Sequence, residues 1–332
     1  MKSFLYEILH TQMTDGNSKT IRPISNPLST RTRLSSVKAN FSYSRDFPLR
    51  FGSFWRGVFA LKKLLRWIRI QGLVTRLLGY QYRVATDLVE IDLTYLCNLR
   101  CNNCNRSSAQ APEDIHIDLD TVRQFVDDSL AAGRYWARIR LLGGEPTLHP
   151  DFMEIIRELQ RYQSQFPDTS IQVVTNGYGQ KVKAILKLLP ASIYIENSSK
   201  DGEVQPGFGP FNLAPQDSIA YAGADYRNGC SIASTCGMGL TPQGYYPCAV
   251  AGGIDRVLGM RRGRNKLPAA DDEMRDLMDI ACRLCGRFRD GHYVPEKLRP
   301  PLLTQQTSRS WQKIYVDWRT RSNAAVIPLE AE

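Results

Sequence analysis

Between residues 88 and 199 the sequence alternates between β-rich and amphipathic segments, and this alternation constrains the fold more than any other feature. The β-rich segments are residues 88–96, 137–146, 170–179 and 191–199. Between them, apolar residues recur at helical spacing in residues 118–132, 151–163 and 180–189. Strands that alternate with helices through short connections favour a parallel sheet built of right-handed crossovers. We therefore predict an α/β fold for this region.

Three cysteines follow the first predicted strand. Cys97, Cys101 and Cys104 have the spacing C-x3-C-x2-C directly after LVEIDLTYL. Four-iron clusters are held by thiolates, one per iron. A loop with three cysteines can hold such a cluster and leave one iron open to another ligand. Two alternatives remain at this point: a zinc site with a distant fourth ligand, for which His116 is the nearest candidate, or three unrelated buried thiols.

The other five cysteines lie beyond residue 200, where the alternation of strands and helices fades. They are Cys230, Cys236, Cys248, Cys282 and Cys285. Glycine and proline are frequent in this part, and one more helix is predicted at about residues 308–320. The clustered thiols indicate a loop-rich unit organised by metal more than by a hydrophobic core. A zinc ribbon is the alternative, because zinc also binds four thiolates.

The cysteine loop CNLRCNNC, together with GGEP at residues 143–146 after the second strand, resembles the radical S-adenosylmethionine (SAM) superfamily. The resemblance covers about residues 88–200 and implies a parallel (β/α) barrel. Only about 30 residues separate the fourth strand from Cys230, so we predict a partial, reduced barrel. The resemblance also implies that Cys97, Cys101 and Cys104 bind a 4Fe-4S cluster, and that SAM chelates its fourth iron. Cleavage of SAM would then give a 5′-deoxyadenosyl radical that abstracts hydrogen from a substrate.

Polar residues at the strand ends are the expected SAM contacts, because parallel barrels open their active face at the carboxyl ends of the strands. The glycine pair lets backbone approach a ligand closely, so that peptide groups at 143–145 can bind the methionine ammonium. The alternative for each polar residue is a local role in a turn. The expected cofactor-binding residues are Gly143, Gly144, Glu145, Thr175, Asn176, Glu196 and Ser198. Asn103 stands where the family commonly has an aromatic residue, so adenine packing is expected from elsewhere.

The C-terminal cysteines resemble the auxiliary-cluster domains of such enzymes, called SPASM or, in the shorter form with four cysteines, twitch. LTPQGYYPC is similar to the hairpin that precedes the second cysteine of that pattern. The spacing from Gly244 to Cys248 is one residue shorter than in the family pattern. The resemblance implies an auxiliary 4Fe-4S cluster held by Cys230, Cys248, Cys282 and Cys285.

Cys236 competes with Cys230 for the ligand role, and we favour Cys230 because its distance to Gly244 is closer to the family range. If it is not a ligand, Cys236 is either a catalytic thiol near the substrate or a buried structural cysteine.

The net charge of +10 is confined to the N-terminal part. Residues 1–90 hold 15 Lys and Arg against 5 Asp and Glu, whereas residues 91–332 hold 28 of each. Residues 1–50 have the composition of a disordered segment, and residues 54–79 predict a basic amphipathic helix. In this helix Lys62, Arg66, Arg69 and Arg76 share one face. The helix either packs on the main domain with its charges in water, or contacts an anionic partner, namely anionic lipid, nucleic acid or an acidic carrier protein.

The sequence thus predicts three units: a basic extension (1–87), a radical SAM partial barrel (88–225) and a twitch- or SPASM-like auxiliary domain (226–332). The expected activity is oxidation, crosslinking or epimerisation of a ribosomal peptide or a small biosynthetic intermediate, with electrons from an external flavodoxin- or ferredoxin-like donor. An RNA-modifying radical enzyme, or a non-catalytic iron–sulfur or zinc protein that uses the basic arm, is the alternative. The clustered thiols and the lack of a long apolar segment favour a reducing, cytoplasmic location.

Overall fold

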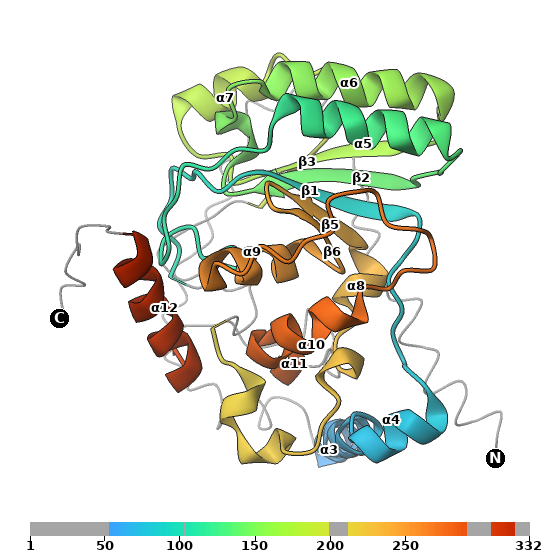
Figure 1. The fold of residues 1–332 in the computed structure, drawn as a ribbon, viewed down its shortest axis with the longest axis vertical. Helices are drawn as coiled ribbons and strands as arrows, with labels where there is room; N and C mark the ends of the chain where they lie inside the picture. Colours follow the sequence, from blue (N-terminus) through green and yellow to red (C-terminus); the bar gives the residue numbers. More distant parts are fainter. Residues whose placement is uncertain (1–52, 103, 199–211, 291–306, 323–332) are drawn as a thin grey trace.

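The computed structural model describes residues 53–102, 104–198, 212–290 and 307–322. Two expectations, disorder in residues 1–50 and the role of Asn103, lie outside these residues. The described chain forms a single six-stranded sheet with helices on both faces (Figure 1). This confirms the predicted α/β class and a partial barrel.

The sheet has the strand order β4-β3-β2-β1-β5-β6. All neighbouring pairs are parallel except β5 and β6, which form an antiparallel hairpin. The first four strands lie within the segments predicted from the sequence. The strands are β1 (Leu88–Thr94), β2 (Arg138–Gly143), β3 (Ser170–Thr175), β4 (Tyr194–Asn197), β5 (Met238–Thr241) and β6 (Gly244–Tyr246).

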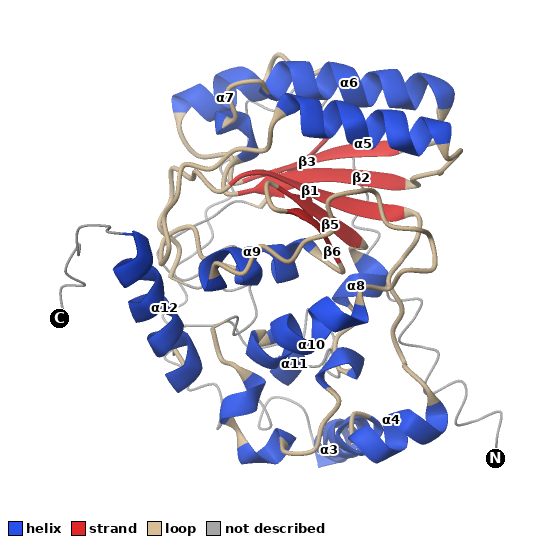
Figure 2. Cartoon of the chain, in the orientation of Figure 1, coloured by secondary structure: helices blue, strands red, loops and turns tan. Residues whose placement is uncertain are grey.

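Three helices cover one face of the sheet, as the apolar periodicity predicts (Figure 2). They are α5 (Leu119–Ala131), α6 (Phe152–Gln165) and α7 (Gln180–Leu186). The opposite face carries α9 (Ala249–Leu258), and α12 (Arg309–Ser322) packs beside α9. Apart from two N-terminal helices described below, the other helices have ten residues or fewer. They are α8 (Ile232–Thr235), α10 (Arg275–Leu284), α11 (Arg287–Asp290), η1 (Pro146–Leu148), η2 (Pro215–Asp217), η3 (Ile219–Tyr221) and η4 (Tyr226–Asn228).

The central strand β1 is buried along almost its whole length, although its side chains differ between the two faces. Val89, Ile91 and Leu93 join the main hydrophobic core and are at most 1 % exposed. Glu90 and Asp92 alternate with them and are therefore directed to the other face, since successive side chains of a strand point in opposite directions. The second face of the sheet is thus both buried and charged.

The hairpin predicted around LTPQGYYPC is present as β5 and β6, and β5 pairs with β1 in the middle of the sheet. The sheet and its core therefore use residues from both sides of the predicted boundary at residue 225. The division into units itself stays a prediction.

The single helix predicted over residues 54–79 is wrong, because the chain forms two helices, α3 (Ser53–Arg69) and α4 (Gly72–Leu78). The break occurs where Ile70 is fully buried and Gln71 adopts an extended conformation. The backbone there hydrogen-bonds residues 223–225, with Gly72 N donating to the Gly223 carbonyl at 2.9 Å. Pairing with this distant segment replaces the helical hydrogen bonds.

The contact between α3 and the rest of the protein also differs from the prediction. The apolar Leu61 and Ile68 are 55 % and 42 % exposed, whereas Arg66 from the basic face docks inward. Its guanidinium donates to the carbonyls of Gly229 and Phe288 and lies over the Phe288 ring. A backbone-directed arginine therefore anchors the helix. No helix in the described ranges is long and apolar enough to cross a membrane.

Candidate active site

The carboxyl end of β2 is pressed against the chain that leaves β1, and the two glycines there are required by this close approach. A Cβ atom on Gly143 would collide with the Thr94 carbonyl oxygen, and one on Gly144 would collide with that of Leu96. Gly143 also has a φ of 124°, which favours glycine. Gly144 N donates to Thr94 O at 2.6 Å and Glu145 N to Leu96 O at 2.9 Å. The glycine turn thus fixes the start of the cysteine loop against β2.

Glu145 is completely buried and ties the end of β2 to the end of β3. Its Oε1 accepts hydrogen bonds from the hydroxyls of Thr147 and Thr175, at 2.7 and 2.8 Å, and a longer one from Thr147 N. Its Oε2 accepts from Asn176 N at 2.8 Å. Of the two roles considered for Glu145, these contacts correspond to support of the loop. Both carboxylate oxygens already have protein donors.

Asn176 connects β3 directly to the cysteine loop. Its Nδ2 donates to Asn98 Oδ1 at 2.8 Å and lies 3.8 Å from Cys97 Sγ. Its Oδ1 accepts from Tyr178 N at 2.7 Å, which is the local turn role considered for this residue. Asn176 therefore combines a turn contact with a contact to the predicted cluster loop. Asn98, inside the cysteine motif, was not singled out from the sequence.

The three cysteines of the loop form one electrostatic group with Glu145. Burial is the main cause that raises the pKa of Cys97 to about 11, and the negative charges of Cys104 and Glu145 add to it. Cys101 is buried and also acts on Cys97. These thiols can be ionised together beside a buried carboxylate only when a cation compensates them, because buried charges are stable only when paired or bound to metal. This donor set suits iron.

The residues predicted at the end of β4 lie in different environments. Ser198 is held against β3, with both its N and its Oγ donating to the Thr175 carbonyl at 2.9 and 2.8 Å. Glu196 faces Arg140 of β2 at 2.8 Å, and its side chain is 51 % exposed. Ser198 thus lies at the strand ends with Thr175, whereas Glu196 belongs to the charged face of the sheet.

The charged face contains an ion-pair network that the sequence did not reveal. Arg106, from the cysteine loop, binds Asp92 at 3.1 Å and Glu90 at 3.3 Å, and all three are at most 5 % exposed. Arg140 binds the other oxygen of Glu90 at 2.6 Å. Burial raises the pKa of Asp92 to about 6, although Arg106 acts in the opposite direction. The network therefore holds the cysteine loop against β1 on the charged face of the sheet.

A second clamp on the cysteine loop comes from the C-terminal part of the chain. Arg256 of α9 donates to the carbonyls of Ala111 and Arg106, at 2.7 and 2.8 Å, and its guanidinium lies over the Tyr95 ring. Tyr315 of α12 hydrogen-bonds Ser107 at 2.9 Å. No sequence signal distinguished Arg256 from other basic residues, because its role depends on α9 packing under the loop.

The C-terminal cysteines converge on one cavity, which Cys230, Cys248, Cys282 and Cys285 line together. Burial is the largest cause that raises the pKa of Cys285 to about 12, and Cys230 raises it further. The pKa of Cys248 and of Cys282 is raised in the same way, by burial first and then by the neighbouring thiols. Four mutually close thiols in a cavity whose other lining residues are mostly apolar suit a bound metal centre.

Cys236 is not among the residues that line this cavity. It lies just before the first residue of β5, where Glu90, Arg140 and Arg138 act on it electrostatically. Burial raises its pKa to about 12. The Cys236 thiol therefore lies beside the charged face of the sheet, at the amino ends of β1 and β5. Cys97 follows the opposite, carboxyl end of β1.

His116, the candidate fourth ligand of a zinc site, packs edge-on against the His149 ring, with 5.2 Å between the ring centroids. Its backbone pairs with Thr94. Within the described ranges, no three His, Cys, Asp or Glu side chains are arranged as ligands of one metal ion. In a tetrahedral zinc site the Zn–S distance of about 2.3 Å would bring the sulfurs to roughly 3.8 Å from one another.

Comparison with known families agrees with this geometry, since residues 91–195 match the radical SAM superfamily. The matched range contains the cysteine loop, the glycine turn and the ends of the first three strands. Residues 91–195 are therefore similar to a radical SAM domain. This family uses a 4Fe-4S cluster and SAM.

The curated relatives are named GTP 3′,8-cyclase. The protein from Paenarthrobacter nicotinovorans is 31 % identical over 146 residues, which are 43 % of this chain and 39 % of the relative. Those from Mannheimia succiniciproducens and Chlorobaculum tepidum are 32 % and 39 % identical over 92 and 71 residues. These shorter matches cover 27 % and 21 % of this chain, and 26 % and 21 % of the two relatives. The chain thus spans about a fifth to two fifths of the length of these relatives.

Two solved structures are distantly similar. BtrN in complex with SAM and 2-DOIA has a TM-score of 0.35 and 14 % identity, over 68 % of this chain and 97 % of BtrN. SuiB from Streptococcus suis, bound to SAM, has a TM-score of 0.26 and 18 % identity, over 37 % of this chain and 26 % of SuiB.

Proposed function

We propose that the protein is a radical SAM enzyme whose Cys97, Cys101 and Cys104 hold the SAM-binding 4Fe-4S cluster. The observation that carries this proposal is the contact of Asn176, at the end of β3, with Cys97 and Asn98 of the cysteine loop. The glycine turn of β2 packs on the same loop. The cysteine loop, the glycine turn and the end of β3 thus lie at one edge of the sheet, which supports this edge as the site where the cluster and SAM would bind.

When bound, the cluster supplies one electron that cleaves the C5′–S bond of SAM to methionine and a 5′-deoxyadenosyl radical. The chain's own residues position the ligand. The amide N–H groups of Gly144 and Glu145 are already used within the protein, so an ammonium, which only donates, would use carbonyl oxygens of this turn. Asn176 and Ser198 are the side chains expected beside the methionine or ribose. Glu145 holds Asn176 through its backbone amide, and Ser198 is held by the Thr175 carbonyl.

We propose further that Cys230, Cys248, Cys282 and Cys285 hold an auxiliary 4Fe-4S cluster. Their shared cavity supports this set, and the location of Cys236 away from it supports Cys230 over Cys236 as the ligand. Four thiolates can ligate all four irons, so this cluster would have no open position for a substrate.

The proposed substrate is a ribosomal peptide or a small biosynthetic intermediate that undergoes oxidation, crosslinking or epimerisation, with electrons from an external donor. The charged face of the sheet, where Arg140 and the partly exposed Glu196 lie, suits a polar substrate. The name of the curated relatives refers to GTP, a small polar molecule. Because the matches cover less than half of those relatives, GTP itself is one compound to test rather than the expected substrate.

The experiment is an anaerobic preparation in which iron is counted and SAM cleavage is followed by formation of 5′-deoxyadenosine. We expect about eight irons per chain, four in each cluster, and product that requires reductant and SAM. The Cys101→Ala variant should lose about half the iron and all product. Equal product from wild type and this variant would refute the enzyme function.

Matched cysteine variants test the auxiliary cluster separately. Cys230→Ala should lose the auxiliary iron, whereas Cys236→Ala should retain it, with both samples compared by electron paramagnetic resonance. The reverse result would make Cys236 the ligand. About four irons together with one zinc per wild-type chain would refute the auxiliary cluster and leave the SAM-binding cluster intact.

A further inference from the structure

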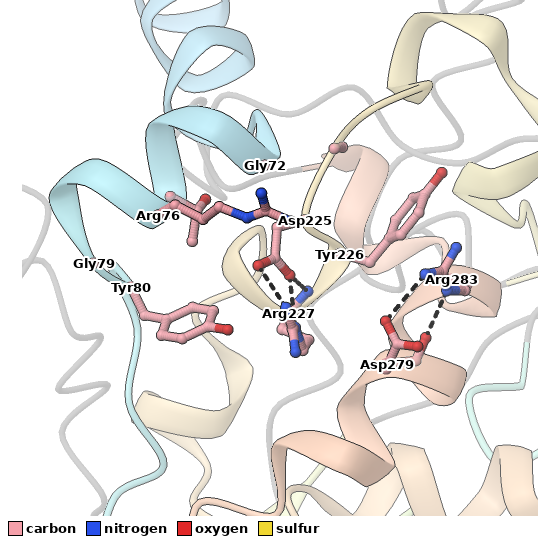
Figure 3. Close-up of a pocket in the computed structure, with 11 residues that line it drawn as sticks. Gly72, Arg76, Gly79, Tyr80, Asp225, Tyr226, Arg227, Asp279 and Arg283 are labelled. Atoms are coloured by element: carbon pink, nitrogen blue, oxygen red, sulfur yellow. Dashed lines mark hydrogen bonds and ion pairs between the residues drawn. The ribbon is translucent and has the colours of Figure 1, made fainter.

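A pocket of about 390 Å³ lies next to the four-cysteine cavity, between α4, η4 and α10 (Figure 3). Its volume is within the range of ligand-binding pockets in proteins. Three arginines line it, one from each of these elements: Arg76, Arg227 and Arg283. The proposed SAM site uses none of them. We refer to this feature as the arginine pocket.

Positive charge exceeds negative charge in the arginine pocket, because only two aspartates line it. Asp225 binds Arg227 at 2.8 Å and Asp279 binds Arg283 at 3.1 Å. Arg76 is exposed and has no ion-pair partner in the part of the chain that the structure describes, and its side chain extends into the pocket in Figure 3. Since a guanidinium has five N–H donors, the paired arginines also retain donors for an incoming anion.

The wall of the pocket is organised by contacts between arginines and aromatic rings. Tyr80 has the Arg275 guanidinium 3.4 Å from its ring centroid and that of Arg227 at 5.7 Å. Arg69 donates to the Gly79 carbonyl at 2.6 Å. Arg275 is itself paired with Glu273, so Arg69 is the further positive charge beside the pocket. Planar groups that are already packed lose little freedom when an anion binds.

The arginine pocket and the four-cysteine cavity share a wall. Tyr226 and Arg227 line both. The Arg283 guanidinium lies 5.0 Å from the Tyr226 ring centroid on the pocket side. On the other side Tyr226 packs on Phe288, which also lines the cysteine cavity. One layer of side chains therefore separates the basic surface from the four thiols.

We infer that the arginine pocket is the docking site of an acidic one-electron carrier protein of the flavodoxin or ferredoxin class. This inference rests on the proposed auxiliary cluster, because the shared wall is what makes a redox partner the occupant. Carboxylates of the carrier pair with Arg76 and with the free donors of Arg227 and Arg283. One electron passes between the carrier and the cluster, so that one is oxidised as the other is reduced, and no bond or proton moves.

An anionic membrane is the other partner that a basic surface could serve, and α4 does expose Leu73 and Leu77 beside the pocket. A concave site lined by paired arginines suits protruding carboxylates better than a flat lipid surface. The charged groups are also concentrated over the cysteine cavity, whereas a membrane would not require that location.

The test measures association of the cluster-loaded protein with an oxidised flavodoxin by biolayer interferometry at low and high salt. Arg76→Gln should slow association about threefold and Arg76→Glu about tenfold, with smaller effects at high salt. Arg283→Gln should act in the same direction as Arg76→Gln. The matched control is Arg157→Gln on α6, which removes the same charge on the opposite side of the protein (Figure 1).

Equal association of wild type and Arg76→Glu, or an equal loss in Arg157→Gln, would overturn the docking site. Binding to vesicles with anionic lipid that requires Arg76, without binding to flavodoxin, would overturn it in favour of a membrane. Iron is counted on the same samples. If the wild-type protein holds no auxiliary iron, the proposed cluster is refuted. If it holds the full iron but does not bind the carrier, the docking inference alone is refuted.

Discussion

Replacement of Glu145 by alanine should destabilise the strand-end junction more than any surface carboxylate replacement. The side chain is fully buried and accepts hydrogen bonds from both Thr147 and Thr175 and from the Asn176 amide. In Glu145→Ala the two threonine hydroxyls can rotate toward other acceptors. The backbone N–H groups of Thr147 and Asn176 cannot turn, and they are left without this acceptor.

The magnitude follows from these two N–H groups. An unsatisfied buried donor costs about 1–3 kcal/mol. The Asn176 amide has a short bond of 2.8 Å, while that of Thr147 is weak at 3.4 Å. We therefore expect Glu145→Ala to lower the free energy of unfolding by about 2–4 kcal/mol. Glu145→Gln keeps the volume and one acceptor, so its loss should be roughly half as large.

Urea unfolding followed by tryptophan fluorescence, to which the buried Trp136 contributes, measures this difference. Glu154→Ala is the matched control, because Glu154 is partly exposed on α6 and pairs with Arg157 one turn away. Such a surface pair contributes less than about 1 kcal/mol. If Glu145→Ala and Glu154→Ala shifted the unfolding midpoint equally, the assigned role of Glu145 would be incorrect.

Three further predictions concern the same region. Gly144→Ala should destabilise the protein by about 1–3 kcal/mol through a backbone collision, whereas Gly57→Ala, which has open space in α3, should be neutral or slightly stabilising in the same unfolding assay. Arg256→Lys keeps the charge but loses the fork that holds two loop carbonyls, so cluster iron should be lost faster to a chelator than from wild type. Burial holds the pKa of His149 below its ordinary value; the unfolded chain then binds the proton more readily, and stability should fall as pH drops through about 6.5. His149→Gln should reduce that pH dependence, and an unchanged slope would contradict it.

Much of the sheet could be predicted from the sequence because its signals are local. Each of the first four strands lies within a predicted segment, since apolar periodicity reports directly which residues are buried. The glycine pair at 143–144 also marked a close backbone approach, although the structure shows that the approaching atoms belong to the chain after β1. The prediction of one continuous helix over 54–79 failed because the apolar pattern is local, whereas residues 223–225, about 150 positions further along the chain, hydrogen-bond the backbone of Ile70 and Gly72.

The sequence by itself determined which chemistry the chain can support: three cysteines at ligand spacing, a glycine turn after the next strand, and a second set of thiols. Only the tertiary structure decided how these groups meet. It brought Asn176 to Cys97, gathered Cys230 with Cys248, Cys282 and Cys285, and left Cys236 beside the charged face of the sheet. Spacing is encoded locally, whereas the distance between residues far apart in the chain is set by how sheet and helices pack, and no short motif records that.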